Sequence, residues 1–303
     1  MPGQDTFSTG ALKLVQQEGG YGAVPIDGWR QLLLYRKDLF EQQGLPAPDN
    51  WRRILQAAQA LHNPPKIWGF IAATEPDKIY TEQVFEHFAL SGGVRLRDSA
   101  GNISLNTLEM IETLKFYNTL AKKTPRGNLG FIDSRHEYVT GRAAMIEWSP
   151  FILDEISGLR QDLPVVPDIR QGRLGYLAQN TGFLSTIIGP GGPAQYYSIN
   201  CLGIARDGNK ADAQQWIEFL LSDGYLKWLN MAPWGKLPMR KGTPEDNTRY
   251  VKGWINLDHG PRETAQIIAS FDQEEVMTLV EHAFEDFDRW RVFENNDALI
   301  SKI

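Results

Sequence analysis

Apolar and polar positions follow two rhythms along this chain, which predict buried strands and amphipathic helices in turn. Residues 32–35 (LLLY) form a continuous apolar run, typical of a strand that is covered on both faces. A loop rich in Gly and Pro follows, after which Asp49 or Asn50 can cap a helix. In that helix the apolar residues recur on one face, at Trp51, Ile54, Leu55, Ala58 and Leu61.

Strands and helices continue to alternate along the chain, which predicts an α/β fold. The predicted strands are residues 67–72, 142–147, 183–189 and 199–205, with a hairpin within 94–105. Helices are predicted at about 81–90, from 107 onward, at 209–221, around 226–229 and at 274–287. Asn106 or Thr107 can cap a helix that carries its apolar residues roughly in register, at Leu108, Ile111, Leu114, Tyr117 and Ala121. The GPGGP stretch at 189–193 is expected to break the chain, because it is too rich in Gly and Pro to join either neighbour.

Composition places the chain among ordinary globular proteins. It has 303 residues, 42% of them hydrophobic and 22% charged, which is enough for two domains. A net charge of −6 argues against a nucleic-acid-binding protein, which would show a basic stripe. No apolar segment approaches the length of a membrane span, and residues 1–10 lack the zones of a signal peptide. The single cysteine, Cys201, permits no internal disulfide.

Sequence motifs for catalysis and for metals are missing. There is no phosphate loop, nucleophile elbow or HExxH motif, and the five histidines lack the spacing of metal ligands. We therefore expect no cofactor, no metal site and no enzymatic activity. The acidic residues of 274–288 fit a solvated helix face, although the sequence does not exclude a pair of carboxylates that flank one glycosidic bond.

Aromatic residues are the more informative component, at 11% of the chain. Trp29, Trp148 and Trp234 stand beside Gly, Pro or polar residues rather than in apolar runs. Two interpretations remain open: half-buried anchors of the core, or flat faces on which a ligand stacks.

Several segments, in order, resemble the extracellular solute-binding proteins of ABC sugar importers (family 1, the maltose-binding-like proteins). The first segment is an apolar strand that ends in Tyr-x-Lys-Asp-Leu-Phe, then a Gly-Leu-Pro-x-Pro loop and a Trp at a helix start. Its residues here are Tyr35, Lys37, Asp38, Leu39, Phe40, Gly44, Leu45, Pro46, Pro48 and Trp51. Residues 91–120, 138–151, 209–223 and 234–242 resemble later segments of the same family.

The resemblance implies a two-lobed α/β fold of the periplasmic-binding-protein type, with a cleft between the lobes. It implies a remnant of the first lobe and hinge at 1–28, the second lobe at 29–195, a return to the first lobe at 196–258, and C-terminal helices on the second lobe at 259–303. The first lobe should be incomplete, because the usual N-terminal part of the family is not in this sequence. The implied protein is a monomer, periplasmic or lipid-anchored outside the cell. It binds a sugar or related polyol and delivers it to the permease subunits of a membrane transporter, and it binds no nucleic acid.

The resemblance also implies which residues contact the ligand. Asp27, Trp29 and Arg30 follow the turn that lines the family's cleft, and Glu75 matches an acid that bonds sugar hydroxyls. Trp148 and Phe151 come at the strand end that carries the family's stacking aromatic, and which of the two rings stacks is open. Asn200, Trp234 and Arg240 complete the predicted set.

Three alternatives remain at this stage. The ligand could be a polyol, a glycoside or a small peptide rather than a sugar. The chain could be a glycoside-acting enzyme with an unmarked pair of carboxylates. It could also be a truncated relative that binds nothing.

Overall fold

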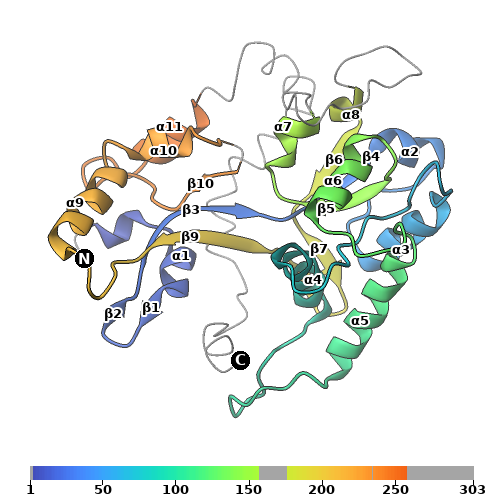
Figure 1. Cartoon of the computed structure of the whole chain (residues 1–303), viewed down its shortest axis with the longest axis horizontal. Helices are drawn as coiled ribbons and strands as arrows, with labels where there is room; N and C mark the ends of the chain where they lie inside the picture. Colours follow the sequence, from blue (N-terminus) through green and yellow to red (C-terminus); the bar gives the residue numbers. More distant parts are fainter. Residues whose placement is uncertain (1–2, 157–175, 234, 258–303) are drawn as a thin grey trace. The chain divides into compact units, whose positions relative to one another are not determined.

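The computed structural model describes residues 3–156, 176–233 and 235–257 (Figure 1). These residues form two compact units. Unit 1 consists of residues 3–30 and 197–257, and unit 2 of residues 31–156 and 176–196. The helix that the sequence predicts at 274–287, and Trp234, lie outside the described residues.

Unit 1 is organised around strand β3 (Val24–Arg30). It lies between β9 (Tyr197–Leu202) and β10 (Leu237–Pro238), and both pairings are antiparallel. A short hairpin precedes β3, formed by β1 (Gln16–Gln17) and β2 (Gly20–Tyr21). The helices of this unit are η1 (Gln4–Thr6), α1 (Thr9–Leu14), α9 (Lys210–Leu220), α10 (Tyr225–Leu229) and α11 (Arg249–Ile255).

Tyr225 joins the elements of unit 1 at its core. Its buried hydroxyl donates to the carbonyl oxygen of Ile26 at 2.7 Å. The same oxygen accepts the backbone N–H groups of Met239 at 2.9 Å and Arg240 at 3.1 Å. Its ring meets Tyr250 edge to face. Helix α10 is thereby fixed to β3, to the segment after β10 and to α11.

Unit 2 is built on β4 (Leu32–Arg36), which pairs antiparallel with β5 (Met145–Trp148) and β6 (Thr181–Leu184). All five residues of β4 are buried, which confirms the strand predicted from the LLLY run. The helices of this unit are α2 (Lys37–Gln42), α3 (Trp51–Ala60), α4 (Ile79–Gly92), α5 (Leu108–Ala121), α6 (Phe131–Val139), α7 (Ile152–Ile156) and α8 (Tyr176–Gln179).

Trp51 shows how the predicted helix cap fixes the packing of unit 2. Asn50 is the cap, since its side-chain oxygen accepts the backbone N–H of Arg53 at 3.0 Å. Trp51 then stacks on Phe116 of α5 at 4.1 Å between ring centroids, and its indole N–H donates to Ser91 of α4 at 2.9 Å. One aromatic residue thus holds three helices together.

Two sequence predictions for unit 2 are wrong. The GPGGP stretch does not lie outside the neighbouring elements: Gly189 ends β7 (Ile187–Gly189), and Gly192 begins β8 (Gly192–Ala194), which pairs with β7 in a hairpin. Residues 67–72 form isolated bridges to Ala143 and Ile146 rather than a regular strand.

The predicted apolar face of α5 is also not the buried one. Leu108, Ile111 and Leu114 are exposed, whereas Thr113, Phe116 and Leu120 are buried. Thr113 tolerates burial because its hydroxyl donates to a carbonyl oxygen of its own helix, that of Glu109, at 2.7 Å.

Among the described residues, none of the helices has the length and apolar character that a membrane crossing requires.

Candidate functional site

The predicted ligand contacts are divided between the two units. Unit 1 contains Asp27, Trp29, Arg30, Asn200 and Arg240, and unit 2 contains Glu75, Trp148 and Phe151. Trp234 is outside the described residues. Each group is described within its own unit.

Asp27 is a fully buried acid in the middle of β3. One of its carboxylate oxygens accepts the side-chain amide N–H of Asn200 at 2.6 Å. The other accepts the indole N–H of Trp228 at 2.6 Å and the ammonium of Lys236 at 3.0 Å. A buried carboxylate is stable only when donors surround it in this way. Asp27 therefore orients its three neighbours and does not itself offer an unoccupied oxygen.

The register of the sheet explains why these residues meet. Asp27 lies opposite Asn200 on β9, and Trp29 lies opposite Ser198, two positions further along. Side chains two apart in a strand share a face, so Trp29 is on the same face as Asp27. Trp29 is half-buried, and the Lys236 ammonium lies 4.2 Å from the centre of the Trp228 ring. We call Asp27, Trp29, Asn200, Trp228 and Lys236 the unit 1 set.

The two predicted arginines of unit 1 are engaged in packing. Arg30 is buried and donates to the Tyr197 hydroxyl at 3.4 Å. Arg240 donates to the Thr6 hydroxyl at 3.0 Å and to the Leu221 carbonyl oxygen at 2.6 Å. These contacts are structural, and a ligand-binding role for either arginine stays a prediction.

In unit 2, Trp148 and Phe151 differ in exposure. Trp148 ends β5, is buried, and packs against Tyr80 with the ring centroids 4.7 Å apart. Phe151 follows in the turn before α7 and keeps 39% of its surface exposed. Of the two rings, Phe151 is thus the one with a face accessible from outside the unit, and Trp148 is the one held in the core.

Tyr80 fixes Trp148 from the first turn of α4. Its hydroxyl donates to the Glu147 carbonyl oxygen at 2.9 Å, which ties α4 to β5. Burial, together with nearby Tyr117 and Glu147, raises the pKa of Tyr80 well above its usual range. Tyr80 is therefore a neutral hydrogen-bond donor over the physiological pH range.

Glu75 lies in the loop before α4 and keeps 36% of its side chain exposed. Its backbone N–H donates to Leu129 at 3.2 Å, and one carboxylate oxygen lies 3.9 Å from the Lys78 ammonium. The other oxygen lies against Gly130, at the start of α6, where a Cβ atom would collide with it. A carboxylate is stabilised at the N-terminus of a helix, so Gly130 allows Glu75 to occupy a favourable position.

An open hollow of about 460 Å³ lies beside Glu75. It is lined by residues at and just before the first turn of α4: Asp77, Lys78, Ile79, Thr81 and Glu82. Lys78 lines the hollow and its ammonium lies 3.9 Å from Glu75, while Tyr80 in the same turn packs against Trp148. We call Glu75, Tyr80, Trp148 and Phe151 the unit 2 set. It provides an acid and an exposed ring in the same unit as the hollow.

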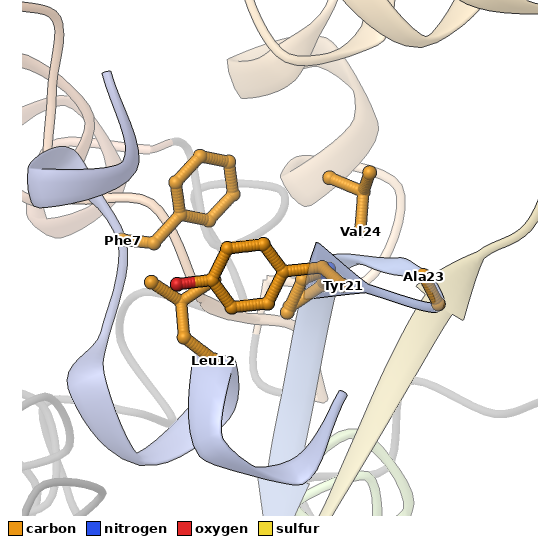
Figure 2. A pocket seen from close by; sticks show the side chains of 6 residues that line it. Phe7, Leu12, Tyr21, Ala23 and Val24 are labelled. Carbon is orange, nitrogen blue, oxygen red and sulfur yellow. The ribbon is translucent and has the colours of Figure 1, made fainter. Parts of the chain in front are cut away.

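A second hollow, in unit 1, is not a ligand site. Figure 2 shows the Tyr21 ring extending toward Phe7 and Leu12 there, and the space that they line has no room for a water molecule. It is a packing seam between the N-terminal residues and β3.

Next to Trp148 in sequence, the buried side chain of Glu147 faces the buried side chain of His87. His87 on α4 places one ring nitrogen 3.3 Å from a carboxylate oxygen of Glu147 and the other 3.3 Å from the Ala194 carbonyl oxygen. Both side chains are fully buried, and the second Glu147 oxygen has no hydrogen-bond partner among the described residues. The pair links α4 and β5 to β8 beneath the unit 2 set.

Sequence reasoning missed Trp228, Lys236, Tyr80, His87 and Glu147. Lys236 and Trp228 reach Asp27 only through long-range folding, and no local pattern marks them. Glu147 sits within the predicted strand at 142–147, where an acid at the buried end was a signal that could have been used. In the described part of the chain, no group of three His, Cys, Asp or Glu residues is arranged to hold a metal ion.

The chain is similar to known transport proteins. No protein-family model matches it. It is 29% identical over 246 residues to an Escherichia coli (strain K12) protein named "Putative ABC transporter periplasmic-binding protein YcjN". The match covers 79% of this chain and 53% of the relative. This chain therefore spans about half the length of that curated relative.

Solved structures share the fold. A solute-binding protein from Agrobacterium radiobacter K84, in complex with ribitol, has a TM-score of 0.63 at 22% identity, over 94% of this chain and 75% of that one. Maltose-bound MalE3 of T. maritima also has a TM-score of 0.63 at 22% identity, over 98% and 75%. A protein from Thermotoga lettingae TMO with bound α-D-tagatose matches with the same score and identity, over 94% and 72%.

These matches confirm the fold that the sequence indicated. The fold is α/β of the periplasmic-binding-protein type. The likeness to the E. coli relative, which is named as a periplasmic-binding protein of an ABC transporter, supports the resemblance that the sequence motifs indicated.

Proposed function

We propose that this chain binds a sugar or a polyol as the solute-binding component of an ABC importer and passes it to the permease subunits in the membrane. The protein would work outside the cytoplasm, either in the periplasm or anchored by lipid at the outer cell surface. Support comes from the similarity to the E. coli relative, and from the ribitol, maltose and tagatose that are bound in the structurally similar proteins.

The observation that carries the proposal is the unit 2 set. A sugar or polyol offers hydroxyls and a patch of C–H bonds, which suit a carboxylate and an aromatic face respectively. Glu75, next to the hollow, supplies a half-exposed carboxylate, and Phe151 supplies an exposed ring in the same unit. Tyr80, in the first turn of α4, packs against Trp148 and bonds the Glu147 carbonyl oxygen.

In unit 1, the residues that best fit a ligand are those that Asp27 orients. Asn200 is exposed while its amide donates to Asp27, so its carbonyl end is left for a hydroxyl donor. Trp29 offers part of its ring on the same face of the sheet.

A panel titration tests the proposal. Isothermal calorimetry of the chain with maltose, ribitol, mannitol and tagatose should give saturable binding of at least one compound, with no product by chromatography. Phe151→Ala should weaken that binding at least tenfold, because it removes the exposed ring. Phe219→Ala is the matched control, a Phe 45% exposed on unit 1, and should leave affinity unchanged. Binding that is unaffected by Phe151→Ala in a folded variant would sink the site; turnover of a glycoside would favour an enzyme instead.

A further inference from the structure

Helix α5 of unit 2 leaves a stripe of large aliphatic side chains exposed. Leu108, Ile111 and Leu114 are each three residues apart, so they lie beside one another along the helix. Leu108 and Leu114 keep 75% and 51% of their surface accessible. The helix packs on α3 and α4 through its other side, which holds Phe116 and Leu120. One inward apolar stripe is enough to fix a surface helix, so the second stripe needs another explanation.

The exposed apolar side chains continue into the segment that leads into α5. Ile103 and Leu105 come shortly before the helix, and both are exposed. Exposed apolar residues that occur singly need no explanation, whereas a group of them marks a contact with another molecule. We call Ile103, Leu105, Leu108, Ile111 and Leu114 the α5 surface.

Two opposite charges lie beside this stripe. Glu112 and Lys115 are exposed, and among the described residues neither has an ion-pair partner. At about 3.6 residues per turn, both fall on the same flank of Ile111, with the acid before the base along the chain. The stripe therefore has an apolar centre and a flank whose charge changes sign along the helix.

This charge order makes the surface complementary to a second copy of itself. When two identical helices pack antiparallel about a two-fold axis, each flank meets the same flank of the other copy, in reverse order. With the axis between Glu112 and Lys115, the acid of each copy lies opposite the base of the other, and the two Ile111 side chains lie close to the axis. A parallel pairing would instead place like charges opposite each other.

We propose that two copies of this chain associate through the α5 surface, with their α5 helices antiparallel about a two-fold axis. Burial of the aliphatic stripe provides most of the affinity. The two reciprocal Glu112–Lys115 pairs set the direction of the helices and favour a second copy over a partner of different sequence. This dimer differs from the monomer that the family resemblance implied, and it does not depend on which ligand the chain binds.

The test begins with sedimentation of the full chain over a range of concentrations, which should show a monomer–dimer equilibrium. Ile111→Lys should weaken the dimer about tenfold or more, because it places a charge at the centre of the apolar contact. Ile132→Lys is the matched control, since Ile132 is also an exposed isoleucine on a helix of unit 2 but lies outside the α5 surface. It should leave the dimer unchanged, and both variants should keep the circular dichroism spectrum of the unmodified chain.

Charge reversal tests the antiparallel pairing itself. Glu112→Lys and Lys115→Glu each place like charges opposite one another, so each variant alone should dimerise about three- to tenfold more weakly. Mixed in equal amounts, the two variants should associate with each other as tightly as the unmodified chain does, because the mixed dimer restores both opposite pairs. A chain that carries both reversals should also dimerise normally.

Three outcomes overturn the proposal. A chain that stays monomeric at every concentration would assign the α5 surface to a different occupant. A dimer that Ile111→Lys and Ile132→Lys weaken equally would place the contact elsewhere. Two charge-reversed variants that do not associate with each other would exclude the antiparallel pairing. Sugar binding, measured on the same samples, is a separate readout and fails or succeeds independently.

Discussion

The buried pair of His87 and Glu147 permits a sharp prediction about what stabilises unit 2. Both ring nitrogens of His87 face acceptors, the Glu147 carboxylate and the Ala194 carbonyl oxygen, each at 3.3 Å. Neither side chain has any exposed surface. We predict that the two side chains form a buried ion pair in which His87 donates to both acceptors, and the substitutions below test this prediction.

The magnitude follows from what each substitution leaves behind. His87→Ala removes the only side-chain partner described for the Glu147 carboxylate, and breaking a buried ion pair in this way costs about 3–5 kcal/mol. Glu147→Gln keeps the shape, and its amide N–H can donate to the histidine, so its cost is about 1 kcal/mol. In the Glu147→Gln background, His87→Ala leaves only a neutral amide unpaired, at about 1–3 kcal/mol.

The cavity left by His87 is the same in both backgrounds, so the difference between the two His87→Ala costs isolates the buried charge. We expect that difference to be about 2 kcal/mol. Urea unfolding of the four proteins, followed by circular dichroism at pH 7, measures it. Costs of His87→Ala that agree within about 0.5 kcal/mol in the two backgrounds would refute the ion-pair reasoning.

Three further predictions concern the other sites. Asp27→Ala should lower the unfolding free energy by about 3–5 kcal/mol in urea melts, because Asn200, Trp228 and Lys236 lose their common acceptor. As a control, substitution of an exposed acid, Glu218→Ala, should change the unfolding free energy by less than about 0.5 kcal/mol. Equal effects of the two substitutions would contradict the account. Gly130→Ala should weaken ligand binding about tenfold, because the extra methyl group displaces the Glu75 carboxylate. Gly203 has open space around it, so Gly203→Ala should leave binding unchanged. If calorimetry finds that neither variant changes affinity, Glu75 is not a ligand contact. Burial raises the pKa of four tyrosines: Tyr80, Tyr117, Tyr138 and Tyr225. The stability that they confer is therefore complete below the unfolded-state pKa of about 10 and declines as the pH rises above that value. Ultraviolet titration should find these tyrosines un-ionised until the protein unfolds, and their ionisation near pH 10 in the native state would disprove this.

Local patterns were sufficient for the elements that long-range packing does not alter. The buried β4, the Asn50-capped α3 and the helix from Thr107 all follow from apolar runs and caps. The buried face of α5 could not be chosen from sequence, since apolar residues occur on two of its sides and only packing against Trp51 and α4 decides between them.

The candidate site was predicted in part. Asp27 and Asn200 were singled out separately, yet only the antiparallel register of β3 and β9 reveals that they bond to each other. Trp228 and Lys236 reach the same acid from 201 and 209 residues away in sequence, a separation that no local motif encodes. The Trp148–Phe151 pair was predicted, and only the fold distinguishes the buried ring from the exposed one.

The central claim, that a sugar or polyol binds at the unit 2 set, is tested most directly by hydrogen–deuterium exchange of the full chain. It is measured with and without a saturating ligand from the calorimetric panel. The account predicts slower exchange at residues 74–82, in the loop and first turn of α4, and at residues 148–153, around Phe151. Saturable binding with unchanged exchange in both segments would contradict it.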